Sequence, residues 1–170
     1  LPSSCISRRG RKFTKSVYFR SSVTSPVSIS ILHTAVVFGR ATPFVNFLPR
    51  LEMQEEGSVH KVNHLMFSPN GKRFMVLYRW FCGQRKYTRL VTCNVDGSNM
   101  YVLSDDDMVS HCYWKNDNEI IAFERKKEFG PGYYLMKDKT QEWQHLWGQL
   151  SNDGHPSYCP TDNNLVVIDS

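Results

Sequence analysis

The feature that most constrains the fold of this chain is a short pattern that occurs three times after residue 60. Each copy has a histidine, an aromatic residue three positions later, turn-forming residues and then a short apolar segment. The copies begin at His64, His111 and His155, which are 47 and 44 residues apart. Half of the 6 histidines fall in this register, so chance is a poor explanation. The repeat indicates a fold built from similar units.

Each copy predicts a β-hairpin. Pro-Asn-Gly in the first copy and Asn-Asp-Asn in the second supply the positive-φ positions that a tight reversal needs. Further short strands are expected over residues 88–94, 100–103 and 132–138. Four short strands in about 45 residues is the spacing of a propeller blade. The sequence therefore predicts an all-β fold of four-stranded antiparallel β-propeller blades.

The predicted propeller is incomplete. Residues 60–170 supply about two and a half blades, or three at most, whereas a closed ring needs several. Either the first fifty residues form a further irregular blade, or the sequence is part of a longer chain. We favour the second interpretation, because open blades leave strand edges unpaired.

Charge separates a segment of uncertain structure, residues 1–55, from the repeats in residues 56–170. The first fifty residues carry eight Lys or Arg and no acidic residue, while residues 51–170 carry thirteen Lys or Arg against sixteen Asp or Glu. The basic segment could be a transit sequence, an arm that contacts phosphates, or sequence without a functional partner. Because the repeats are slightly acidic, we expect no nucleic-acid partner.

The cysteines and the uncharged stretches of the sequence indicate the cellular compartment and whether the chain associates with a membrane. The 5 cysteines are an odd number and form no C-x-x-C pair, so we expect free thiols in a reducing, cytoplasmic compartment. The longest uncharged stretch, residues 21–39, is rich in Ser and Thr and contains Pro26. It would make a poor membrane span, and we expect no membrane partner.

The histidine register predicts a common site. Each histidine precedes or opens the first strand of its blade, and first strands line the central channel. His64, His111 and His155 should therefore point towards one mouth of that channel. Converging imidazoles suit a divalent metal such as Zn, Mn, Fe or Ni. The alternative is that each histidine only hydrogen-bonds the backbone of a neighbouring blade.

Counting along the first hairpin adds an arginine to this site. The cross-strand neighbour of His64 should lie near Leu77, which brings Arg79 to the same mouth. Arg79 is followed by Trp80, and such a pair can bind a carboxylate in a bidentate manner and stack a sugar ring. A surface arginine packed on a tryptophan is the alternative. By the same count His111 should face Glu124 and Arg125.

Several of these segments resemble known propellers. His64-Leu-Met-Phe-Ser-Pro-Asn-Gly-Lys72 resembles the strand-turn signature of TolB-like propellers. Ser110-His111-x-x-Trp114 and Asp153-Gly154-His155-Pro156-Ser157 are narrower; with Thr88-Arg-Leu90 and Asn94-x-Asp-Gly-Ser98 they look like the oligogalacturonate lyase family. The likeness covers residues 60–170.

The resemblance implies a metal-dependent lyase that cleaves a small uronic-acid oligosaccharide by β-elimination. It implies a divalent metal, typically Mn²⁺, with His111 and His155 as ligands and His64 as the base, while Arg79 neutralises the uronate carboxylate. The family also uses a second histidine and a glutamine, where this chain has Ser157 and Asn152. The competing hypothesis is a non-catalytic TolB-like or WD-repeat-like propeller that binds a protein partner.

Overall fold

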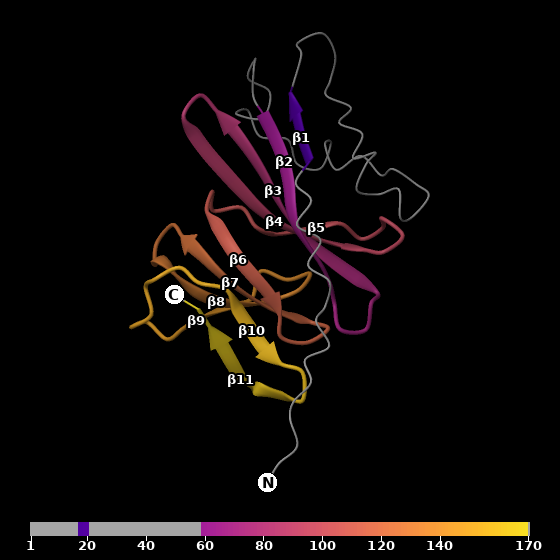
Figure 1. The fold of residues 1–170 in the computed structure, drawn as a ribbon, viewed down its shortest axis with the longest axis vertical. Coiled ribbons are helices and arrows are strands. Elements are labelled where there is room, and N and C mark those ends of the chain that lie inside the picture. The colour runs from indigo at the N-terminus through magenta and orange to yellow at the C-terminus, as the bar shows by residue number, and fades with distance from the viewer. Residues whose placement is uncertain (1–16, 21–58, 170) are drawn as a thin grey trace.

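The computed structural model describes residues 17–20, of which only the backbone is considered, and residues 59–169 (Figure 1). These residues form eleven strands and no helix, so the all-β prediction is confirmed. No helix among them could cross a membrane. The predicted segment 1–55 lies outside the described residues except for β1. The strands are β1 (Val17–Arg20), β2 (Val59–Phe67), β3 (Arg73–Cys82), β4 (Arg85–Asn94), β5 (Tyr101–Ser104), β6 (Val109–Trp114), β7 (Glu119–Lys126), β8 (Gly130–Lys137), β9 (Trp143–Leu146), β10 (Pro156–Cys159) and β11 (Asp162–Ile168).

The strands form three antiparallel sheets that follow one another along the chain (Figure 1). The first sheet has the order β1-β2-β3-β4-β5, the second β6-β7-β8-β9, and the third pairs β10 with β11. Within each sheet every strand pairs with its neighbour in sequence. From β2 onwards this meander keeps the connections between paired strands short, whereas residues 21–58 separate β1 from β2 in the sequence. The sequence prediction of four consecutive antiparallel strands per unit matches the second sheet and strands β2–β5 of the first.

The two long hairpins turn by different means. Between β2 and β3, Gly71 has φ of 70°, a conformation that glycine adopts at little cost. The Asn-Asp-Asn turn between β6 and β7 has no positive φ, so that part of the prediction is wrong. There the Asn116 side-chain oxygen accepts hydrogen bonds from the N–H groups of Asn118 and Glu119, at 2.8 and 2.9 Å. The asparagine side chain replaces the backbone geometry that a positive φ would supply.

The main core lies between the first and second sheets. Its side chains come from the inward-facing positions of both sheets: Met75, Leu77, Leu90, Leu103, Val109, Cys112, Trp114, Ile120, Ala122 and Met136. Burying one leucine or isoleucine of this set stabilises the fold by about 1.5–3 kcal/mol. The indole N–H of Trp114 also donates to the Met66 carbonyl, 3.2 Å away, and ties β6 to β2.

A second core lies between the second and third sheets, where Phe123, Tyr133 and Tyr158 are buried. The second sheet is therefore covered on both faces. This explains why β7 carries five consecutive buried residues after Glu119, the first four of them apolar, instead of alternating apolar and polar ones.

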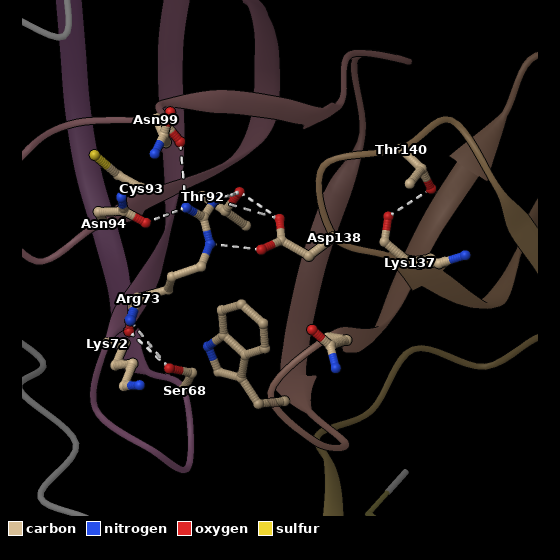
Figure 2. Close-up of polar contacts among 12 residues, drawn as sticks. Ser68, Lys72, Arg73, Thr92, Cys93, Asn94, Asn99, Lys137, Asp138 and Thr140 are labelled. Atoms are coloured by element: carbon tan, nitrogen blue, oxygen red, sulfur yellow. Dashed lines mark hydrogen bonds and ion pairs between the residues drawn. The ribbon is translucent and has the colours of Figure 1, made fainter.

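One end of the interface between the first two sheets is closed by a buried arginine (Figure 2). Arg73 Nε donates to Asp138 Oδ2 at 2.6 Å, and Arg73 Nη2 donates to Thr92 at 2.8 Å. Arg73 Nη1 donates to Asn94 Oδ1 at 2.6 Å. Asp138 also accepts from the Thr92 hydroxyl at 2.6 Å. The charge of Arg73 is thus paired and hydrogen-bonded, as a buried charge must be.

Candidate functional site

Three histidines from three sheets lie next to one another. The rings of His64 and His111 have centroids 5.6 Å apart, and those of His111 and His155 are 3.7 Å apart. His64 is on β2, His111 on β6, and His155 directly precedes β10. The sequence prediction that these three side chains gather in one region is confirmed as a matter of geometry. We call His64, His111, His155 and Arg79 the histidine cluster.

A β-bulge turns His64 out of its strand. The pairing of β2 with β3 shifts between Asn63 and Met66, so one more residue is present on β2 than on β3. His64 has φ of 56°, which is uncommon for a residue other than glycine. Strained backbone of this kind concentrates at functional sites. Here it occurs at the residue whose ring faces His111.

A second bulge shapes the neighbouring strand. The pairing of β6 with β7 shifts between Val109 and His111, and Ser110 is the extra residue. The Ser110 hydroxyl donates to Asp153 Oδ1 at 2.5 Å, which joins the second sheet to the segment before β10. The other Asp153 oxygen lies 3.9 Å from His111 Nε2. Burial lowers the pKa of His111, while the Asp153 charge opposes this shift.

His155 is held by the end of the described chain. The side-chain oxygen Oδ1 of Asp169 accepts from the His155 backbone N–H at 2.6 Å and lies 2.9 Å from His155 Nδ1. These two bonds lower the pKa of Asp169. A side chain on Gly154 would collide with the Asp169 carbonyl, so glycine is required for this close approach. The pair leaves His155 Nε2 as the ring nitrogen available to a ligand.

Arg79 reaches the cluster from β3. Its Nη2 donates to the carbonyls of Ser110 and Val109, at 3.2 and 3.5 Å. The Asn63 amide is oriented so that its oxygen faces hydrogen-bond donors. In this orientation the Asn63 oxygen accepts from Arg79 Nη1 at 3.0 Å and from His64 Nδ1 at 3.2 Å. Arg79 Nε is buried without a hydrogen-bond partner. Burial lowers the pKa of Arg79. Among the described residues, no carboxylate forms an ion pair with this guanidinium.

The strand registers differ slightly from those predicted. Leu77 pairs with Asn63, one residue before His64, as the prediction near Leu77 required. His111 pairs with Phe123, so its predicted alignment with Glu124 and Arg125 is wrong by one to two residues, because the turn between β6 and β7 sets a register that runs unbroken from Trp114 to His111. The His155 backbone N–H donates to Asp169, directly after β11.

Sequence reasoning missed Asn63, Ser110, Asp153 and Asp169 as parts of the site. Asn63 and Ser110 directly precede two of the histidines in the sequence, and Asp153 lies two residues before the third, so this adjacency was the available signal. Asp169 contributes only through the local geometry at the end of β11.

The histidine cluster contains side chains of the types that bind metal ions. Imidazoles and carboxylates are suitable ligands, and His111 Nδ1 is buried without a partner. However, no group of three or more His, Cys, Asp or Glu side chains in the described ranges is arranged to hold a metal. The His111 and His155 rings instead pack against each other, and Asp169 lies beside His155 Nδ1. As arranged, the cluster does not fit a metal site, and the role of His111 and His155 as Mn²⁺ ligands stays a prediction.

The other acidic and thiol groups have structural surroundings. Asp105 accepts two hydrogen bonds from Arg89, each 2.8 Å long. Asp106 lies 3.3 Å from Lys126 Nζ, and Asp107 is 4.0 Å from Arg85 Nη2. This acidic turn pairs with cations of the protein. Cys93, Cys112 and Cys159 are free thiols, as predicted, while the cytoplasmic location stays a prediction.

Comparisons with known proteins add no family to this description. No family model, no curated protein and no solved structure matches the chain. The functional argument therefore depends on the geometry of the histidine cluster.

Proposed function

We propose that the histidine cluster binds the carboxylate of a uronic-acid oligosaccharide and promotes β-elimination, the reaction of an oligogalacturonate lyase. The observation that carries this proposal is Arg79, a partly buried guanidinium that forms no ion pair with a described carboxylate, although the Asp153 charge acts on it, and that is linked to His64 through the Asn63 amide. A charge in this position favours an anionic ligand, and arginine suits a planar carboxylate.

The sheets support a propeller arrangement for this site. Each histidine comes from a different sheet, and within each sheet it lies on or directly before the first strand of the hairpin repeat. A radial arrangement of blades brings such positions to one mouth of a channel. On this proposal the three sheets are two blades and part of a third.

His64 acts as the base in the proposed reaction. Its Nδ1 lies 3.2 Å from the Asn63 oxygen, so Nε2 is the ring nitrogen that takes the proton in this scheme. Nε2 takes the proton from C5 of the uronate, a double bond forms between C4 and C5, and the C4–O bond breaks. Arg79 stabilises the negative charge that spreads into the carboxylate as the proton leaves.

The leaving oxygen needs a proton. His155 is half-exposed, and Asp169 Oδ1 lies 2.9 Å from its Nδ1. A protonated His155 gives its Nε2 proton to the glycosidic oxygen, and the cluster exchanges its protons with water afterwards. No step of this scheme runs through a metal, because the donor arrangement does not provide for one.

The test is turnover of digalacturonate by the chain, followed by the ultraviolet absorbance of the unsaturated uronate product. Activity should fall strongly in His64→Ala and in Arg79→Gln. Asp117→Ala, an exposed change in a turn, is the matched control and should leave activity unchanged. Assays with and without added Mn²⁺ determine whether a metal is required.

Failure of the wild-type chain to release product, with and without Mn²⁺, would remove the lyase proposal. Saturable binding of digalacturonate without turnover would instead support the non-catalytic alternative for this cluster.

A further inference from the structure

The last strand of the third sheet, β11, is apolar on both faces. Its residues Val166 and Ile168 pack into the second core. Successive side chains of a strand point to opposite faces, so Leu165 and Val167 point away from that core. They are 55% and 66% exposed, and Val167 is the most exposed of the large hydrophobic residues in the described ranges.

The same strand lies at an open edge of its sheet. β11 pairs with β10 on one side and with no described strand on the other (Figure 1). The equivalent strands of the other two hairpin repeats, β3 and β7, pair on both sides. β7 is also apolar on both faces, and both faces are buried. β11 therefore has the composition of an interior strand in the position of an edge strand, and such an edge is a template for pairing with another chain.

A second copy of β11 matches this edge in one antiparallel register. A two-fold axis places one residue opposite its own copy and keeps the outer faces of both copies on the same side. With Val166 at the axis, Leu165 of each copy lies opposite Val167 of the other. The four exposed apolar side chains then form one patch, and apolar cross-strand pairs of this kind stabilise a sheet. Asn163 lies opposite Asp169 of the other copy, so an amide faces a carboxylate.

The neighbouring symmetric registers are less favourable. An axis at Leu165 places Val167 opposite Asn163, and an axis at Val167 places Leu165 opposite Asp169. Both registers exchange an apolar pair for a contact between an apolar and a polar residue. In the register centred on Val166, the acidic residues Asp162 and Asp169 are on opposite faces, so no like charges lie directly opposite each other.

We propose that β11 forms the interface of a symmetric dimer, in which two copies of the chain join their third sheets edge to edge in the order β10-β11-β11-β10. Two-fold contacts of this self-complementary kind are the commonest in soluble homo-oligomers. One pair of strands buries less area than a permanent dimer needs, so the dimer should dissociate on dilution. No residue of β11 belongs to the histidine cluster, so the proposal goes beyond the proposed function and does not depend on it.

The test is the oligomeric state of the chain, measured by analytical ultracentrifugation over a range of concentrations. We expect an equilibrium between monomer and dimer. Leu165→Glu and Val167→Lys should each weaken dimerisation about tenfold or more, because each places a charge opposite an apolar side chain. Both side chains are exposed, so both variants should keep the fold, which circular dichroism checks.

The matched control for these variants is Phe67→Glu. Phe67 is also an exposed hydrophobic residue, at 39%, but it lies on the first sheet, which is packed against the second sheet, whereas β11 is in the third. Its replacement should leave the dimerisation constant unchanged. Equal weakening of the dimer by Phe67→Glu and by Leu165→Glu would contradict the assignment of the interface to β11.

The double variant Leu165→Glu/Val167→Lys tests the register. In the proposed dimer the glutamate introduced in one copy lies opposite the lysine introduced in the other, so the double variant should dimerise more tightly than either single variant. Weaker dimerisation than in both single variants would overturn the register. A wild-type chain that stays monomeric up to about 1 mM would overturn the proposal and leave this edge to a strand of another protein. Assemblies larger than a dimer would also contradict it, because a two-fold contact closes after two copies.

Discussion

Arg73 and Arg79 lie on the same strand, six residues apart, and both are directed towards the second sheet. Arg73 has hydrogen-bond partners on all its nitrogens, including the nearly inaccessible carboxylate of Asp138. Arg79 bonds backbone carbonyls and an amide, and its Nε has no partner. We call the Arg73 end of the interface between the sheets the complete end, because the arginine charge there is paired with a carboxylate. We call the Arg79 end the incomplete end, because the arginine charge there is not paired in this way.

Within β3 this difference distinguishes an arginine with a structural role, Arg73, from one whose charge can bind a ligand, Arg79. A guanidinium that already has its carboxylate can only stabilise the fold, while one bonded to neutral acceptors retains a charge that a ligand can satisfy. The strained His64 and the two bulges occur at the Arg79 end. Irregular backbone is not confined to this end, because Asn99, whose carbonyl accepts from Arg73, and Lys139, which follows Asp138, also have positive φ.

The largest expected effect is at the complete end. Asp138→Ala leaves the Arg73 charge buried without its partner and should lower the free energy of unfolding by about 3–5 kcal/mol. Denaturant unfolding measures this. If the alanine variant does not fold, Asp138→Asn, which keeps the shape, should fold with a smaller loss. A loss under about 1 kcal/mol in both variants would contradict the structural role of Arg73.

Arg79 should behave in the opposite way. Arg79→Gln removes a partly desolvated charge that has only neutral partners, so the free energy of unfolding should change by no more than about 1 kcal/mol. The same denaturant experiment tests this, with Asp138→Ala alongside. A loss as large as that of Asp138→Ala would mean that Arg79 is a structural residue.

Much of the fold could be predicted from the sequence, because the repeat and its turn residues fix the hairpins locally. The register could not be predicted to the residue, since bulges at Asn63–Met66 and at Ser110 shift the pairing by one position without a clear sequence signal. The Arg73–Asp138 pair also escaped prediction. Its residues are 65 apart, and only the packing of the first sheet on the second brings them together.

The candidate site was predicted better than its chemistry. The three histidine rings lie close together, as the register of the repeat predicted, and Arg79 is linked to His64 through the Asn63 amide. The metal could not be judged from residue types, because ligand geometry depends on ring orientation. Asp153 and Asp169 were not expected to lie beside His111 and His155.

A third prediction concerns Glu124, a buried acidic residue beside the incomplete end. Burial raises the pKa of Glu124 above its ordinary value of 4.5, while Lys126 opposes the shift and Asp106 adds to it. The folded state therefore holds this proton more tightly, and its contribution to stability is lost as pH rises above 4.5. The unfolding free energy of the wild type minus that of Glu124→Gln should decrease from pH 4 to about pH 8. A difference that is constant or increases with pH would contradict this.

The smallest effect is expected at the surface of the complete end. The Asp117 carboxylate accepts a hydrogen bond from the Asn70 backbone N–H at 2.8 Å and links the turns of two sheets. Asp117→Ala should cost about 0.5–1 kcal/mol, because the bond is exposed. Thermal unfolding measures the change, and a loss of several kcal/mol would show that the turns contribute more than the buried network.

The most direct test of the central claim compares digalacturonate with its uncharged methyl ester in calorimetric titrations of the chain. The account predicts that the acid binds at least about tenfold more tightly than the ester and that Arg79→Gln removes this preference. Equal binding of acid and ester, or a preference that survives Arg79→Gln, would contradict the assignment of Arg79 as the carboxylate ligand.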